Sequence, residues 1–81
     1  MRVRVRLGAG LSRFSRAPAL TLELDDGATV DDLLASLRER EPDLAPALRS
    51  ALPVIGGVHA EPRQRLEDRQ EVALLLPVSG G

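Results

Sequence analysis

The C-terminal carboxylate of Gly81 is the group of this sequence that most clearly suggests a reaction, because it is presented on the pair Gly80-Gly81. Glycine has no Cβ, so two glycines can pass through a narrow channel and adopt backbone angles that other residues avoid. A free α-carboxylate, with a pKa of roughly 3.3–3.7, is ionised at neutral pH and does not transfer its acyl group. Adenylation by ATP would activate it, because AMP is a good leaving group. We therefore expect Gly81 to react inside another protein's active site.

The side chains offer little chemistry of their own. His59 is the single histidine, and a lone histidine in a predicted hairpin is more often a surface residue than a base. The absence of cysteine excludes disulfides, thiol nucleophiles and thiolate metal sites. The sequence identifies no base positioned to activate a serine. We expect that the protein binds neither a cofactor nor a metal, and that it does not act as an enzyme on its own.

Size and charge narrow the class of protein. Eighty-one residues suit one domain, and 43% hydrophobic with 28% charged residues is typical of a folded one. The net charge of −1 argues against nucleic acid or an anionic membrane as partner. The longest apolar run, residues 72–78, is too short to span a bilayer, and the N-terminus does not resemble a secretory signal. We expect a cytoplasmic protein. All eleven basic residues are arginine, so no side-chain amine is present to form an isopeptide bond.

Two strands are predicted first, at residues 2–7 and 20–25, from strict alternation of apolar and polar residues. If they pair antiparallel, the arginines of the first strand face the acids of the second, a favourable arrangement. A docking patch for an acidic partner is the other use of these arginines. Leu11 and Phe14 lie three apart between the strands and predict a helical turn under the sheet. The inward side chains would be Val3, Val5 and Leu7, then Leu20, Leu22 and Leu24.

A helix is predicted to begin after Thr29 and to end before Pro42. Thr29 and Asp32 have the spacing of a capping box, with Asp in place of the usual Glu or Gln. Acids in the first turn and arginines in the last suit the helix dipole. The apolar stripe consists of Val30, Leu33, Leu34 and Leu37.

The second half predicts a short helix, a hairpin and a final strand. Asp43 is expected to cap the helix, which has Pro46 in its first turn and ends before Pro53. Residues 54–55 and 58–60 flank the Gly56-Gly57 turn. Leu66 is an apolar anchor in a polar loop, and residues 71–76 form a central strand, apolar on both faces.

This order predicts an α+β, ubiquitin-like β-grasp fold: a mixed sheet with one main helix packed across it. The first and last strands would be parallel neighbours, joined by a right-handed crossover. Residues 1–76 would form the domain and residues 77–81 a flexible tail that reaches about 16 Å when extended. Pro77 would stiffen the exit of the tail, and Val78 would be its one bulky anchor.

The sequence resembles the family of ubiquitin-like sulfur carriers known as MoaD/ThiS, in which MoaD is the small subunit of molybdopterin synthase. The most specific piece is the ending Pro-Val-Ser-Gly-Gly at residues 77–81, and residues 26–34 resemble the entry to the family's helix. Four positions depart from the family pattern. Gly8 replaces an aromatic residue, Gly56 an asparagine, Arg69-Gln70 a Gly-Asp pair, and Leu76 the first of two prolines.

The resemblance implies a sulfur cycle on Gly81. A ubiquitin-activating-like adenylyltransferase would use ATP to adenylate the glycine, and a sulfurtransferase would supply the sulfur of a thiocarboxylate. The tail, with Pro77, Val78, Ser79 and Gly80 contacting the partner, would then enter the large subunit of molybdopterin synthase in a heterotetramer. There the sulfur would form the dithiolene of molybdopterin.

Three alternatives stay open. The chain could carry sulfur for thiazole, cysteine or tRNA thiolation, although thiazole carriers generally lack much of residues 41–52. A ubiquitin-like modifier would attach Gly81 to a target lysine, whereas a noncovalent β-grasp module would not need the tail. Deleting Gly80 and Gly81 separates the last two.

Overall fold

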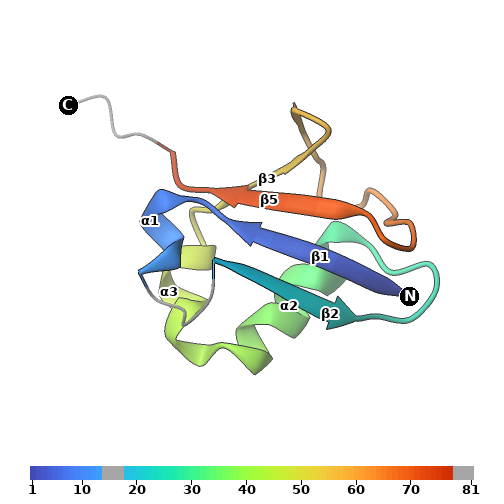
Figure 1. Cartoon of the computed structure of the whole chain (residues 1–81), viewed down its shortest axis with the longest axis horizontal. Helices are drawn as coiled ribbons and strands as arrows, with labels where there is room; N and C mark the ends of the chain where they lie inside the picture. The colour runs from blue at the N-terminus through green and yellow to red at the C-terminus, as the bar shows by residue number, and fades with distance from the viewer. Residues whose placement is uncertain (14–17, 78–81) are drawn as a thin grey trace.

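The computed structural model describes residues 1–13 and 18–77 of the chain. Five strands form one mixed sheet in the order β2-β1-β5-β3-β4, with β1 and β5 parallel and the other pairs antiparallel. Helix α2 lies across one face of this sheet (Figure 1). This is the predicted β-grasp arrangement. The elements are β1 (Arg2–Leu7), α1 (Ala9–Ser12), β2 (Ala19–Glu23), α2 (Val30–Arg40), the 3-10 helix η1 (Pro42–Leu44), α3 (Ala45–Leu48), β3 (Leu52–Ile55), β4 (Val58–His59) and β5 (Glu71–Leu75).

The core lies between the sheet and α2, and it is built from the predicted alternation. In β1 every second side chain is buried, and Val5 faces Leu20 of β2 on one side and Val72 of β5 on the other. Leu11 of α1 is also fully buried, as expected, whereas Phe14 lies outside the described residues. The fully buried residues of largest volume are Leu11, Leu22, Leu33, Leu37, Leu44, Leu74, Val3, Val5, Val30 and Val72.

The expected row of arginines opposite acids is wrong at two of its three positions. Arg2 does face Glu23, with 2.6 Å between Arg2 Nε and Glu23 Oε1. Arg4 faces Thr21 instead. Arg6 faces Ala19 and pairs with Glu71 of β5, at 3.6 Å.

The register explains the difference. Glu23 pairs with Arg2, the first arginine of β1. Asp25, two residues further along the chain, therefore lies beyond the arginines of β1. The second strand accordingly ends at Glu23, and not at Asp25 as predicted.

The capping box of α2 is present as predicted. The Asp32 amide donates to Thr29 Oγ1 at 3.3 Å, and the Thr29 amide donates to Asp32 Oδ2 at 2.9 Å. Two of the amides that a helix N-terminus leaves without intrahelical partners are thereby satisfied. Val30, Leu33 and Leu37 are buried from this helix, and Leu34 is partly buried against the core.

The short second helix differs from the prediction at its start. Pro42 opens the 3-10 helix η1, in which the Leu44 amide donates to the Glu41 carbonyl at 3.0 Å. Asp43 therefore lies inside this turn and does not cap α3, whose N-terminus has no side-chain cap. Pro46 lies in the first turn of α3 as predicted.

The hairpin and last strand shift by one or two residues from their predicted bounds. Strand β3 begins at Leu52 and includes Pro53, whose carbonyl accepts a hydrogen bond from the Ala60 amide at 2.8 Å. The turn glycines, Gly56 and Gly57, have φ values of 59° and 80°, as a type I′ hairpin requires. Strand β4 ends at His59 rather than at residue 60, and β5 ends at Leu75 rather than at residue 76.

The loop before β5 is fixed at several points. Leu66 is buried, as predicted, and its amide donates to the Ala28 carbonyl at 2.9 Å. The Arg2 amide donates to Asp68 Oδ1 at 2.8 Å, which lowers the pKa of that carboxyl. Arg69 then adopts a left-handed backbone, with φ of 66°, at the position where the family resemblance places glycine.

Replacing Thr29 by alanine should lower the free energy of unfolding by about 1 kcal/mol, because the Asp32 amide loses its acceptor. Thr29→Ser is the matched control, since serine keeps the hydroxyl. Chemical denaturation of both variants measures the difference. Equal stability of the two would contradict the capping role.

Replacing Arg69 by asparagine should raise the free energy of unfolding by about 1 kcal/mol, because asparagine tolerates the left-handed region better than arginine does. For a domain of this size the melting temperature would rise by about 4–8 °C. Arg63→Asn, at an exposed position of the same loop, removes the same charge without relieving a positive φ. If Arg63→Asn raises the free energy of unfolding by the same amount, the effect comes from the loss of charge and not from the backbone conformation.

Candidate functional site

The predicted reactive tail continues directly from the middle strand of the sheet. Strand β5 is hydrogen-bonded to β1 on one side and to β3 on the other, and it ends at Leu75. Leu76 and Pro77 follow, and of the predicted site residues Pro77 is the one that the structure describes. Val78, Ser79, Gly80 and Gly81 lie outside the described residues. We call Leu75, Leu76 and Pro77 the tail root.

The tail root is held closely by the segment that follows β1. The Gly8 amide donates to the Leu74 carbonyl at 2.9 Å. A Cβ on Gly8 would lie 3.0 Å from the Leu74 carbonyl oxygen and 2.9 Å from Cδ2 of Leu75. A Cβ on Gly10 of α1 would lie 2.6 Å from Cδ1 of Leu76. At position 8, where the family resemblance implies an aromatic residue, a side chain would therefore be tight against β5 and would require Leu74 or Leu75 to shift by a few tenths of an ångström.

One apolar patch is exposed on the outer face of the sheet, beside the tail root. Leu52 of β3 and Leu75 of β5 are register partners, and they are 40% and 42% exposed. Sequence reasoning named neither residue as a site. The alternation of β5 carried the signal, because burial of Val72 and Leu74 turns Leu75 to the opposite face. We call Leu52 and Leu75 the outer patch.

A second apolar surface adjoins the tail root on its helical side. Leu76 and Pro77 line a hollow of about 510 Å³ together with three residues from α3 and the turn after it. Figure 1 shows α1, α3 and the end of β5 gathered at the same end of the molecule. The remaining lining residues are Pro46, Ala47 and Ser50.

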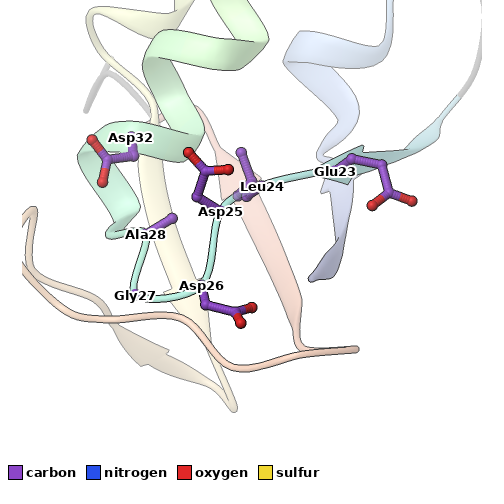
Figure 2. Close-up of a pocket in the computed structure, with 7 residues that line it drawn as sticks. All are labelled: Glu23, Leu24, Asp25, Asp26, Gly27, Ala28 and Asp32. Atoms are coloured by element: carbon purple, nitrogen blue, oxygen red, sulfur yellow. The ribbon is translucent and has the colours of Figure 1, made fainter.

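An acidic hollow of about 420 Å³ lies at the turn between β2 and α2, but three of its four carboxylates have structural roles. Asp32 belongs to the capping box, Glu23 pairs with Arg2, and Asp26 lies 3.7 Å from the Met1 amino group. Figure 2 shows the side chains of Glu23 and Asp26 pointing in different directions rather than converging. Within residues 1–13 and 18–77, no cluster of His, Cys, Asp or Glu could hold a metal ion.

The described residues contain no buried polar or charged side chain that could form an enclosed active site. His59 is exposed in β4, opposite Val54. No helix in the described part of the chain is both long and apolar enough to cross a membrane.

Comparison with known proteins gives the family. Residues 5–81 match the ThiS family. The molybdopterin synthase sulfur carrier subunit of Chlamydomonas reinhardtii is 35% identical over 63 residues, which cover 75% of this chain and 76% of that protein.

Solved structures with the same fold include SAMP1 of Haloferax volcanii, with a TM-score of 0.90, 25% identity and 100% coverage of both chains. A second is from a complex of subunits 1 and 2 of the molybdopterin-converting factor of Helicobacter pylori 26695, with a TM-score of 0.74, 24% identity and 100% coverage of both chains. These likenesses confirm the β-grasp fold. With the match over residues 5–81, they show that the chain belongs to the ThiS family, as a small sulfur-carrier homologue of the molybdopterin synthase subunit and not an enzyme on its own.

Proposed function

We propose that this chain carries sulfur as a thiocarboxylate on Gly81 and donates it for the dithiolene of molybdopterin. The observation that carries the proposal is the 35% identity to a molybdopterin synthase sulfur carrier subunit over 75% of the chain. The described side chains supply no buried catalytic group that would support a different reaction. Gly81 is the reacting residue, and Pro77, Val78, Ser79 and Gly80 are the partner-binding residues.

The chemistry needs two steps before sulfur leaves the carrier. An adenylyltransferase of the ubiquitin-activating type joins the Gly81 carboxylate to the α-phosphate of ATP, and pyrophosphate leaves. Sulfur at the sulfide level, supplied by a sulfurtransferase, then displaces AMP and gives the thiocarboxylate. The thiocarboxylate sulfur then attacks a carbon of the pterin precursor and expels the oxygen-bound group there, which gives a thioester between carrier and pterin. Water cleaves the bond between the Gly81 carbonyl carbon and the sulfur, which leaves the sulfur on the pterin and returns the carboxylate. Two loaded carriers supply the two sulfurs of the dithiolene. The carrier itself binds no cofactor in this cycle.

The position of the tail root supports this use. Pairing of β5 on both sides holds Leu75 in the sheet, and β5 ends at one end of the molecule (Figure 1). Extended residues span about 3.3 Å each, so Pro77 to Gly81 reach about 16 Å. That length lets the terminus enter a buried active site while the folded domain stays outside.

The large subunit of molybdopterin synthase is the acceptor that we propose. In Helicobacter pylori, subunits 1 and 2 of the molybdopterin-converting factor form a complex, and a chain of that complex has this fold. The outer patch gives such a partner an apolar surface beside the tail root. Heterotetramer formation and a cytoplasmic location complete the proposal.

A second candidate is a protein modifier, favoured by the TM-score of 0.90 with SAMP1. The protein named in a related Haloferax volcanii structure is a small archaeal modifier protein. In that function Gly81 would form an isopeptide bond with a lysine of a target. Since this chain contains no lysine, it could not build chains of itself through lysine.

Adding one alanine after Gly81 should lower sulfur loading more than about 100-fold, because the reacting carboxylate moves roughly 3.3–3.6 Å past its aligned position. Gly80→Ala should impair loading less, since it adds a methyl group without moving the terminus. The protein is incubated with the activating enzyme, ATP and a sulfur source. Intact mass then shows whether one oxygen has been exchanged for sulfur.

Unchanged melting temperatures serve as the control for both tail variants, because a terminal tail contributes little to the core. Normal loading of the extended protein would show that the terminal carboxylate is not the working group. Lysine adducts formed in place of the thiocarboxylate would favour the modifier.

Replacing both outer-patch leucines by serine should weaken binding to the large subunit by about 1–2 kcal/mol, or roughly tenfold, through loss of buried apolar area. Val58→Ser is the control, because Val58 is 68% exposed but lies in β4, at the hairpin away from the tail root. Titration calorimetry with the separate large subunit measures both. An equal loss in the control would remove the special role of the outer patch.

A further inference from the structure

A second hollow, of about 540 Å³, lies beside the apolar one on the helical side of the molecule. Arg38 from the last turn of α2 and Arg49, the C-cap of α3, line it together with Ala45 and Pro46 from the first turn of α3. Pro46 lines both hollows, so they adjoin. We call the combined surface the α3 groove: apolar at the tail root and basic at its far end.

The two arginines of the groove have no counter-ion among the described residues. Every ion pair of the described chain involves other groups, and both Arg38 and Arg49 are exposed. The acids nearest in sequence, Glu39, Glu41 and Asp43, do not line either hollow. By contrast, Arg2 and Arg6 of the sheet are each paired with an acid. The groove thus concentrates positive charge that the chain itself leaves unmatched, although its net charge is −1.

We propose that the α3 groove binds an acidic–apolar peptide segment of the large subunit that receives sulfur from the tail. Two carboxylates of the segment pair with Arg38 and Arg49, and an apolar side chain following them packs on Pro46, Ala47 and Leu76. Guanidinium groups pair with carboxylates through two parallel hydrogen bonds, which fixes the direction of the segment as well as its charge.

Continuity with the tail root identifies the protein that supplies this segment. Leu76 and Pro77 line the groove and also begin the tail, so a protein that holds Gly81 must lie within about 16 Å of it. The outer patch lies on the other face of the sheet, and the groove therefore adds a second contact around the same root. This inference rests on the proposed function for the identity of the partner, but not for the existence of the site.

A peptide titration tests the site without any sulfur chemistry. The ¹⁵N-labelled full chain is titrated with acetyl-Glu-Glu-Gly-Ile-Leu-amide, and with acetyl-Gln-Gln-Gly-Ile-Leu-amide as the uncharged control. We expect the acidic peptide to shift the amides of Arg38, Ala47, Arg49 and Ser50, and to bind about tenfold more tightly than the control at low salt. The difference should shrink in high salt. Equal binding of the peptides, or shifts confined to other surfaces, would overturn the proposal.

Matched charge reversals test the groove in the complete protein. Arg38→Glu with Arg49→Glu should weaken binding to the large subunit about tenfold, with KM and kcat for tail loading unchanged. A loss confined to loading would assign the groove to the activating enzyme and overturn the proposal. Arg63→Glu with Arg65→Glu makes the same change in net charge on exposed residues near the other end of α2. Melting temperatures show that both variants are folded. If both double variants weaken binding equally, the effect comes from the net charge of the protein and not from the groove, and the proposal is overturned.

The two proposals fail in different ways. If the unmodified protein takes up no sulfur, the proposed function is wrong, while the peptide titration still reports on the groove. If the protein loads normally but reversal of Arg38 and Arg49 leaves binding to the large subunit unchanged, the groove proposal is wrong and the sulfur carrier stands.

Discussion

The hydrogen bonding of β5 on both sides is the constraint on which the rest of this molecule depends. A strand bonded to β1 and β3 cannot shift its register without breaking two ladders, so Leu75 is fixed relative to the whole sheet. The close contact of Gly8 with Leu74 and Leu75 adds a third restraint at the same point. The chain beyond Pro77 therefore starts from a rigid platform. This matters for a carrier because a partner has to find the tail at a constant place relative to its docking surfaces.

The core and the chemistry of this protein are separated in space. The core consists of leucines, valines and a single alanine, and no polar side chain of the described residues is buried in it. Such a core can be stable without reference to any reaction, since it holds no strained or desolvated catalytic group. The proposed reaction of the terminal carboxylate would allow this separation, because other proteins would supply the activating chemistry. The acidic hollow of Figure 2 is consistent with the same division, since Asp32 caps a helix and Glu23 pairs with Arg2.

Local sequence patterns predicted most of the fold correctly. The predictions that failed depended on contacts between segments or on neighbouring turns that the local pattern does not specify. The alternation of residues 2–7 and the Thr29–Asp32 spacing involve neighbours in sequence, and both were confirmed. The position of Asp25 depended on the register of two strands, and that of Asp43 on a 3-10 turn begun by Pro42, so those predictions were wrong. The α3 groove could not be predicted, because Arg38 and Arg49 belong to different helices that only tertiary packing brings to one hollow. The tail residues after Pro77 remain a prediction from sequence.

Selectivity in such a carrier must come from surfaces around the tail root, because a terminal glycine carboxylate is chemically the same for every client. At position 8, where the family resemblance implies an aromatic side chain, this chain has glycine, and a Cβ there would lie only 3.0 Å from the Leu74 carbonyl oxygen. Apolar area near the root is supplied instead by Leu52 and Leu75 on the outer face and by Leu76 on the helical face. A partner shaped for a protruding aromatic residue would leave a cavity here, and unfilled apolar cavities weaken association. We therefore expect Gly8 to weaken association with a partner whose pocket is shaped for an aromatic side chain, and to matter less for a partner that approaches the sheet closely.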